Sequence, residues 1–232
     1  CGTRFKQLIT DPEILVMPGV HDALGARLAE AAGFSAVVAG GYGATATLLG
    51  RPDSSQLGLT EMSEMYSRLC DATSLPLLAD ADTGFGNVTN VARVVNLYEK
   101  AGVAGLFIED QVFPKRCGHM AGKAVVPVAD WLAKIASALD ARRDPDLVIV
   151  ARTDAMRRIC REITGPCLAN NVESGLSPVL PAAELQALGY AAVVFPVAAT
   201  YAIAHTLREL FSSLRRTGGT AEFTERMLAF DE

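Results

Sequence analysis

Short apolar segments alternate with amphipathic segments along the chain, and each apolar segment ends in polar residues. The apolar segments have the length of strands, and those between them have apolar residues at helical spacing. This alternation predicts a parallel sheet with helical connections. Because polar residues end each strand and 50% of residues are hydrophobic, the pattern indicates a (β/α)8 barrel. Strands are expected at residues 15–19, 36–39, 77–82, 106–108, 147–151, 167–169 and 191–195.

Helices are expected between these strands and at the end of the chain. Thr60 is the expected N-cap of one of them, and the glycines in residues 40–43 are expected to form a turn where the backbone approaches a ligand closely. The 232 residues are predicted to form one domain, with the C-terminal helices at 198–232. The predicted helices are residues 8–14, 23–32, 60–73, 87–101, 128–141, 156–163, 181–188 and 198–216, and one from 220 onward.

The strand count is one short of a complete barrel. After the strand at 147–151, Ala155 is followed directly by a single helix beginning at Met156. A βα repeat needs roughly 30 residues, so one repeat is predicted to be absent between Ala155 and Met156. The numbering would then run across a gap, with a Cα separation well above the ~3.8 Å of a peptide link.

Acidic residues follow two neighbouring strands at the point where each ends. Asp80 and Asp82 are two residues apart, so on a strand both side chains would point to one face. Glu109 follows the next strand. Because parallel strands end at the same edge, the three carboxylates are expected to converge, as in sites for a hard cation and an anionic ligand. The alternative is that Asp80 and Asp82 only cap the next helix.

A polar loop after Glu109 contains Lys115, Arg116, Cys117 and His119. The neighbouring basic groups favour a Cys117 thiolate, and a reactive loop in register with three acids favours catalysis over helix capping. The five cysteines are scattered without zinc-binding spacing, which indicates a reducing, cytoplasmic location.

Several classes of function are disfavoured by charge and hydropathy. A net charge of −5 without a basic cluster argues against nucleic-acid binding. No apolar run reaches the roughly 18 residues of a membrane span, and the N-terminus lacks the apolar core of a signal peptide. The chain begins without Met, so it is expected to be trimmed. The expected partners are therefore small anionic molecules.

Three motifs carry a resemblance that covers nearly the whole chain: ADADTGFGN at 79–87, IEDQVFPKRCGH at 108–119 and ARTDA at 151–155. With them the chain resembles the phosphoenolpyruvate mutase/isocitrate lyase superfamily. Within it, the chain looks most like the methylisocitrate-lyase-like members, which include carboxyphosphonoenolpyruvate phosphonomutase. The resemblance implies a (β/α)8 barrel, a divalent ion (Mg²⁺ or Mn²⁺), and a homodimer or homotetramer in which the C-terminal helices are swapped between subunits.

The resemblance also implies roles for individual residues. Asp80, Asp82 and Glu109 would hold the metal, partly through water, with Asp53 near its water shell. Cys117 would donate a proton from a mobile lid that also contains Gly118 and His119. The substrate would be bound by the backbone amides of Gly41 and Tyr42, by the Arg152 guanidinium, and by Asn170 and Ser177.

The chain departs from the family pattern at Gly40, Phe107, Asn171 and Ser174, where relatives often have Ser, His, Met and Gly, and the family's sixth-strand glutamate falls in the predicted gap. These departures bear on the identity of the substrate more than on the type of reaction.

Three functions are consistent with the motifs and with these departures. The first is a lyase that cleaves a carbon–carbon bond of a 2-hydroxy or 2-oxo di- or tricarboxylate, resembling methylisocitrate, isocitrate or dimethylmalate, through an enolate-type intermediate. The second is oxaloacetate decarboxylation or phosphonate P–C chemistry at the same metal site. The third is a catalytically silent barrel that serves as a binding subunit. The Cys117 loop favours the lyase, because decarboxylation can take its proton from water.

Overall fold

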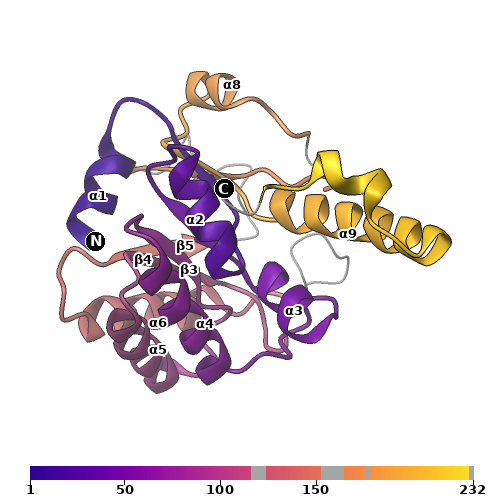
Figure 1. The fold of residues 1–232 in the computed structure, drawn as a ribbon. Helices are drawn as coiled ribbons and strands as arrows, with labels where there is room; N and C mark the ends of the chain where they lie inside the picture. Colours follow the sequence, from indigo (N-terminus) through magenta and orange to yellow (C-terminus); the bar gives the residue numbers. More distant parts are fainter. Residues whose placement is uncertain (116–123, 153–164, 176–177, 230–232) are drawn as a thin grey trace.

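The computed structural model describes residues 1–115, 124–152, 165–175 and 178–229, and it shows parallel strands surrounded by helices (Figure 1). Every strand pairs in parallel with its neighbours. The α/β class and the barrel-type alternation expected from the sequence are therefore confirmed. The strands are β1 (Leu15–Pro18), β2 (Val37–Ala39), β3 (Leu77–Asp80), β4 (Gly105–Glu109), β5 (Val148–Arg152), β6 (Leu168–Asn170) and β7 (Ala192–Phe195).

The strands form two sheets that follow each other around an incomplete barrel. One has the order β2-β3-β4-β5 and the other β1-β7-β6. A parallel bridge between Gly19 and Val38 connects the end of β1 to β2. The continuous order is therefore β5-β4-β3-β2-β1-β7-β6, and no described strand pairs β5 with β6.

The helices cover the outside of this arrangement, and α5 shows clear signals at both ends. α5 begins after Asn87, whose side chain accepts hydrogen bonds from the amides of Thr89 and Asn90, and it ends before Gly102 at φ 89°. The helices are α1 (Gly2–Thr10), α2 (Ala23–Ala31), α3 (Gly41–Leu49), α4 (Leu59–Ala72), α5 (Val88–Ala101), α6 (Val128–Ala141), α8 (Ala182–Ala187) and α9 (Ala198–Thr217), with a short 3₁₀ helix η1 (Ala221–Arg226).

The strands near the site are buried on both faces. Leu77 and Leu106 pack outward against helices such as α4 and α5, whereas Leu78 and Phe107 pack inward. Phe5 of α1 joins this inner group. Apolar residues on both sides of a strand are typical of a parallel sheet covered by helices.

The edge strand β5 is different. Its residues are half-buried and Ala151 is exposed, whereas every residue of β3 and β4 is buried. This exposure matches a barrel that lacks the unit between β5 and β6. The predicted junction at Ala155–Met156, and the helix at 156–163, lie outside the described residues.

The structure differs from the sequence predictions at four places. The first helix is α1, not residues 8–14. The glycines at 40–43 do not form an open turn, because Gly41 begins the nine-residue α3. α4 is capped by Gly58, whose amide donates to Glu61 at 2.7 Å, so Thr60 is not the cap. The last segment forms the short η1, not an α-helix.

Helix α9 projects from the body of the protein (Figure 1). It has 20 residues and none is buried, although it exposes apolar side chains that include Ile203, Leu207, Phe211 and Leu214. Within the described ranges, no helix combines the length and apolarity needed to cross a membrane. Helix α9 thus presents an apolar face that the described residues of the chain do not bury.

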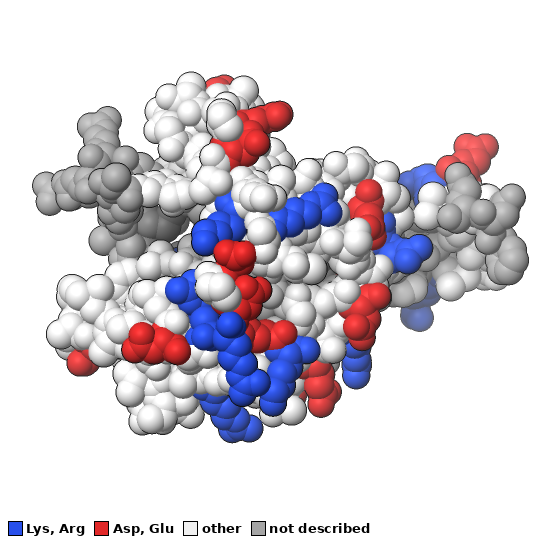
Figure 2. All heavy atoms as spheres, turned by 90° about the vertical axis from the view of Figure 1, so that its left-hand side faces the viewer, with Lys and Arg blue, Asp and Glu red and all other residues white. Residues whose placement is uncertain are grey.

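The face shown in Figure 2 has Lys and Arg side chains interspersed with Asp and Glu. The coloured residues on this face form no broad basic stripe of the kind that binds a nucleic-acid backbone.

Candidate active site

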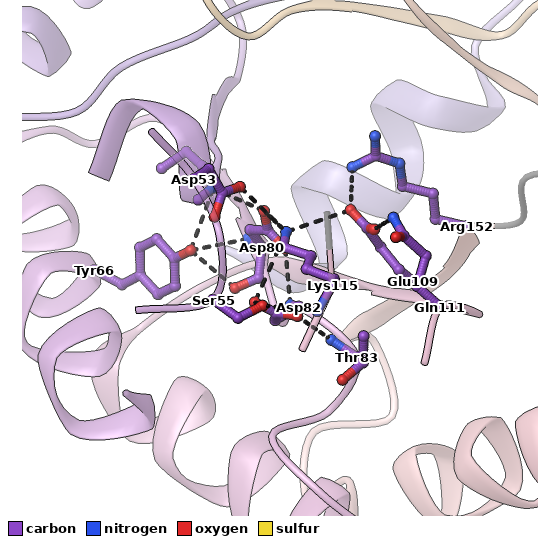
Figure 3. A network of polar contacts seen from close by, with 12 residues as sticks. Asp53, Ser55, Tyr66, Asp80, Asp82, Thr83, Glu109, Gln111, Lys115 and Arg152 are labelled. Atoms are coloured by element: carbon purple, nitrogen blue, oxygen red, sulfur yellow. Dashed lines mark hydrogen bonds and ion pairs between the residues drawn. The ribbon is translucent and has the colours of Figure 1, made fainter. Parts of the chain in front are cut away.

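Four buried carboxylates surround one buried ammonium at the C-terminal ends of the strands (Figure 3). Lys115 Nζ lies 3.5 Å from Asp53, 3.4 Å from Asp80, 3.8 Å from Asp82 and 3.5 Å from Glu109, measured to the nearest carboxylate oxygen. We call these five residues the acidic cluster. The three acids that the sequence placed at one edge therefore converge on one point.

Asp80 is held by two backbone amides and by two tyrosine hydroxyls. Its Oδ2 accepts a hydrogen bond from the Gly41 amide and its Oδ1 from the Asp82 amide, both at 2.8 Å. The hydroxyls of Tyr66 and Tyr98 each donate to the Asp80 carbonyl at 2.9 Å, and the two rings pack edge to face. Asp80 thus has a single fixed orientation.

Asp82 reaches the cluster for a reason that the sequence did not reveal. It lies beyond the end of β3 and has φ 52°, so strand alternation does not aim it. Its Oδ1 accepts from the Thr83 amide at 2.8 Å, and its Oδ2 accepts from the Ser55 hydroxyl at 3.2 Å. A left-handed turn stabilised by these two bonds points the carboxylate back toward Asp80.

Glu109 connects the cluster to an arginine. Its Oε1 accepts from Arg152 and its Oε2 from Gln111, each at 2.6 Å. Glu109 and Arg152 are paired in register as the last residues of β4 and β5. The Arg152 guanidinium also lies 5.5 Å from the centre of the Phe107 ring, within the range of a cation–π contact.

The charges in the cluster shift the pKa values of its members in different directions. Burial would raise the pKa of Asp80, but Lys115, Arg152 and the two amides together lower it. Burial raises the pKa of Asp82 to about 6, and repulsion from Asp80 and Glu109 adds to the rise while Lys115 opposes it. Burial would lower the pKa of Lys115, yet the surrounding carboxylates raise it well above its ordinary value. Lys115 is therefore a cation at neutral pH.

The donor set of the cluster fits a divalent ion. Mg²⁺ prefers carboxylate oxygens at about 2.0–2.1 Å, and the Lys115 ammonium already shows that four carboxylates accept a cation between them. Among the described residues, however, no group of three acidic, His or Cys side chains is already arranged to hold a metal. The oxygens must move inward, and the space taken by Lys115 must be vacated.

The structure brings together some of the predicted site residues and leaves others apart. Asp53, Asp80, Asp82, Glu109 and Arg152 share one network, and the Gly41 amide donates to Asp80.

Two predicted substrate-binding residues lie outside this network. Tyr42 is the second residue of α3, and its ring packs edge to face against Tyr201. Asn170 ends β6, which lies at the opposite end of the described strand order from β5. Cys117, Gly118, His119 and Ser177 lie outside the described residues.

Sequence reasoning missed five members of the network. Lys115 was assigned to the neighbourhood of Cys117, whereas its ammonium is buried among the acids. Tyr66 and Tyr98 had no signal beyond apolar positions on α4 and α5. Ser55 and Gln111 are ordinary polar loop residues in the sequence, and only the hydrogen bonds to Asp82 and Glu109 identify them.

Comparison with known proteins gives consistent matches. The family model of phosphoenolpyruvate phosphomutase matches residues 5–165. The 2,3-dimethylmalate lyase of Eubacterium barkeri is 38% identical over 265 residues, covering 100% of this chain and 92% of the relative. Oxaloacetate acetylhydrolase, solved with the inhibitor 3,3-difluorooxalacetate, is 33% identical with a TM-score of 0.87, covering 94% of this chain and 86% of that chain. Phosphonopyruvate hydrolase in complex with oxalate and Mg²⁺ is 27% identical with a TM-score of 0.88, covering 100% and 92%.

The length of one alignment bears on the incomplete barrel. The alignment with the dimethylmalate lyase spans 265 positions and uses the whole 232-residue chain, so about 33 positions of the relative have no counterpart here. That is the size of one βα unit, roughly 30 residues. The difference supports the predicted absence of such a unit.

The raised pKa of Asp82 predicts that ionised Asp82 opposes folding of the metal-free protein. This loss of stability is absent below the ordinary pKa of 3.8, where Asp82 is protonated in both states. It is complete above the folded-state pKa of about 6. Asp82→Asn removes the charge, and Asn tolerates the positive φ. We expect its free energy of unfolding to exceed that of the wild type by about 2–3 kcal/mol at pH 8, and by less than about 1 kcal/mol at pH 4.

Urea denaturation in EDTA at several pH values measures this difference. Asp71→Asn, at an exposed position of α4, is the control and should change little at any pH. A less stable Asp82→Asn protein at pH 8 would contradict the assignment.

Proposed function

The chain belongs to the phosphoenolpyruvate phosphomutase family of the PEP mutase/isocitrate lyase superfamily, and within it we propose a Mg²⁺-dependent carbon–carbon lyase. Its substrate would be a 2-hydroxy or 2-oxo di- or tricarboxylate, such as a dimethylmalate- or methylisocitrate-like acid. The observation that carries the proposal is the convergence of Asp80, Asp82 and Glu109 beside Arg152. The similarity to a dimethylmalate lyase over the whole chain supports it.

Asp80, Asp82 and Glu109 would hold the Mg²⁺, with Mn²⁺ as an alternative, and Asp53 would bind through a water molecule. The bound ion supplies a Lewis acid for the oxygen at C2 and its adjacent carboxylate. The hydrogen bonds from the Gly41 amide to Asp80 and from Ser55 to Asp82 orient the carboxylates before any cation binds. Such orientation by groups around the ligands sets metal affinity.

Arg152 is placed to bind a substrate carboxylate. Its side chain is 28% exposed, while the Glu109 side chain that it contacts is only 4% exposed, so the guanidinium reaches from the buried cluster toward the open side. A planar guanidinium binds a carboxylate through two parallel hydrogen bonds. As the carbon–carbon bond breaks, negative charge grows on the departing fragment, and this is where a fixed cation lowers the barrier most.

The first turn of α3 would contribute to the same step. Gly41 and Tyr42 are its first two residues, and amides in that position have no partner within the helix. The Gly41 amide already donates to Asp80, so the Tyr42 amide is the better candidate for a substrate carboxylate. The helix dipole favours an anion there.

Cys117 would donate the proton to carbon, with Gly118 and His119 beside it, and Asn170 and Ser177 would contact the second carboxylate. The Cys117 assignment rests on the motif. Cys117→Ser should lower kcat by about 10²–10⁴-fold, because a hydroxyl is a poorer acid than a thiol. Mn²⁺ affinity, measured by electron paramagnetic resonance, should stay within about twofold of the wild type. Undiminished turnover would remove Cys117 from the mechanism.

A second candidate is cleavage or decarboxylation of oxaloacetate. It is favoured by the similarity to oxaloacetate acetylhydrolase, whose structure was solved with a difluorinated oxaloacetate. Phosphonate P–C chemistry is the remaining alternative on the same carboxylates. All three reactions need an anionic 2-oxo or 2-hydroxy acid, so the cluster does not separate them.

A substrate screen with Mg²⁺ decides among these reactions. We expect a dimethylmalate- or methylisocitrate-like acid to yield a 2-oxo acid, detected as pyruvate or by its hydrazone, and Arg152→Lys to reduce kcat/KM at least about tenfold because the two-pronged contact is lost. CO₂ or oxalate from oxaloacetate would support the second candidate. Release of phosphate from a phosphonate would support phosphonate P–C chemistry and contradict the lyase.

We also propose that residues 198–232 pack against a second copy of the chain, forming a homodimer or homotetramer around one barrel domain per subunit. The support is α9, which has 20 residues, none of them buried, and an exposed row of apolar side chains. A helix that buries its apolar face against a neighbour gains stability that it lacks in the monomer.

Sedimentation velocity tests this proposal. Phe211 is 59% exposed on α9, and Phe211→Asp should weaken association at least about tenfold, or 1.4 kcal/mol. Leu188→Asp, at a 63% exposed position outside α9, is the matched control and should leave the oligomer intact. A monomeric wild-type protein at micromolar concentration would contradict the swap.

A further inference from the structure

Lys115 has an unusual environment for a lysine. Its ammonium lies between 3.4 and 3.8 Å from an oxygen of each of four carboxylates, and none of them is closer. An ammonium has three N–H groups, so it cannot satisfy four partners with directed bonds. A lysine that serves one ion pair lies nearer to one partner, whereas Lys115 lies near the centre of its cage. This is the placement of a cation that neutralises a cavity.

The charge balance explains why a cation must be there. Asp53, Asp80, Asp82 and Glu109 are all at most 8% exposed, and the Arg152 guanidinium lies 2.6 Å from Glu109. Without the Lys115 ammonium at their centre, these four buried carboxylates would face each other beside the Arg152 guanidinium. Uncompensated buried charges of one sign strongly oppose folding.

A divalent ion and the Lys115 ammonium cannot both occupy this place. Ligation by Asp80, Asp82 and Glu109 needs their oxygens to close to about 2.0–2.1 Å around one point. The point that these oxygens face is the one near which Nζ lies. The backbone does not have to leave with the side chain, because the Lys115 amide is anchored separately on the Ser55 hydroxyl at 3.1 Å.

We propose that Lys115 is an internal counter-ion that takes the place of the divalent metal and that metal binding is an exchange in which the ammonium is expelled. The inference rests on the proposed metal site of the preceding subsection. The exchange explains how a protein with four buried acids remains folded without metal. It also lowers the apparent affinity for the metal, because each binding event must displace the ammonium. Lys115 is thus a positioning residue for the acids and a competitor for their ligand.

The exchange predicts effects of opposite sign in one variant. Lys115→Met keeps an unbranched side chain and removes the charge. It should lower the stability of the metal-free protein in urea and, at the same time, bind Mn²⁺ at least about tenfold more tightly by electron paramagnetic resonance, which is 1.4 kcal/mol. A purely structural lysine would lower both quantities, and a lysine that only contacts substrate would change neither.

Two variants control for charge and for location. Lys115→Arg keeps the charge and should keep Mn²⁺ affinity within about threefold of the wild type. Lys134 is the matched lysine, since its Nζ donates to the Thr83 carbonyl at 2.8 Å, beside the cluster but outside it. Lys134→Met should leave Mn²⁺ affinity within about twofold. Tighter binding in both Met variants would overturn the proposal, because it would reflect general charge removal.

A measurement on the wild-type protein covers the case in which Lys115→Met fails to fold. Lys115 is 4% exposed, so reductive methylation should modify it slowly in EDTA and at least about tenfold faster with saturating Mg²⁺, as followed by peptide mass spectrometry. Lys134 should label equally in both conditions. Labelling of Lys115 that does not respond to Mg²⁺ would overturn the exchange.

The outcomes also separate this inference from the proposed function. Mg²⁺-dependent labelling without turnover of any acid in the screen would support the exchange and contradict the lyase. Turnover with Mn²⁺ binding that is not tightened in Lys115→Met would support the lyase and contradict the exchange. A folded protein in which neither the wild type nor Lys115→Met binds Mn²⁺ would contradict both.

Discussion

Repulsion among four buried carboxylates is the constraint on which the rest of this structure depends. Asp53, the pair Asp80 and Asp82, and Glu109 come from three segments of the chain, and like charges held this close repel each other. Lys115 compensates part of their charge, and Arg152 compensates Glu109 from the side. Burial, together with repulsion from the neighbouring carboxylates, raises the pKa of Asp82 to about 6 although Lys115 opposes the rise. Sites built for a ligand commonly store destabilisation of this kind.

Backbone amides and side-chain hydroxyls from several elements hold these charges in place. Tyr66 and Tyr98, from α4 and α5, bind the Asp80 carbonyl, while the amide of Asp82 binds its carboxylate. Each tyrosine also fills the core between the strands and the helices. The two tyrosines thus stabilise the hydrophobic core and also hold the backbone of Asp80. A change in core packing would therefore change the geometry of the acidic cluster.

The end of the described strand order is the other feature with consequences for function. Among the described strands the order runs from β5 to β6, and β5 carries Arg152 at its end. Glu109 and Phe107 hold Arg152 by an ion pair and a cation–π contact. Asp80 and Glu109, by contrast, end the fully buried strands β3 and β4, and Asp82 follows β3, so the acidic cluster is less exposed than Arg152.

The order of local elements was decided by the sequence. Alternating apolar and amphipathic segments determine a parallel α/β fold, because each pattern can bury its apolar residues in only one way. The same pattern placed Asp80 and Glu109 at one edge, since parallel strands all end on the same side. It also indicated a missing βα unit.

Tertiary structure decided what those acids contact. The left-handed turn that aims Asp82, the helix that begins at Gly41 and the burial of Lys115 all depend on contacts between segments far apart in the chain, such as Ser55 with Asp82. Local sequence patterns report which residues can be buried. They do not report which distant charge a buried group will meet, because that requires the strand order and the loop paths together.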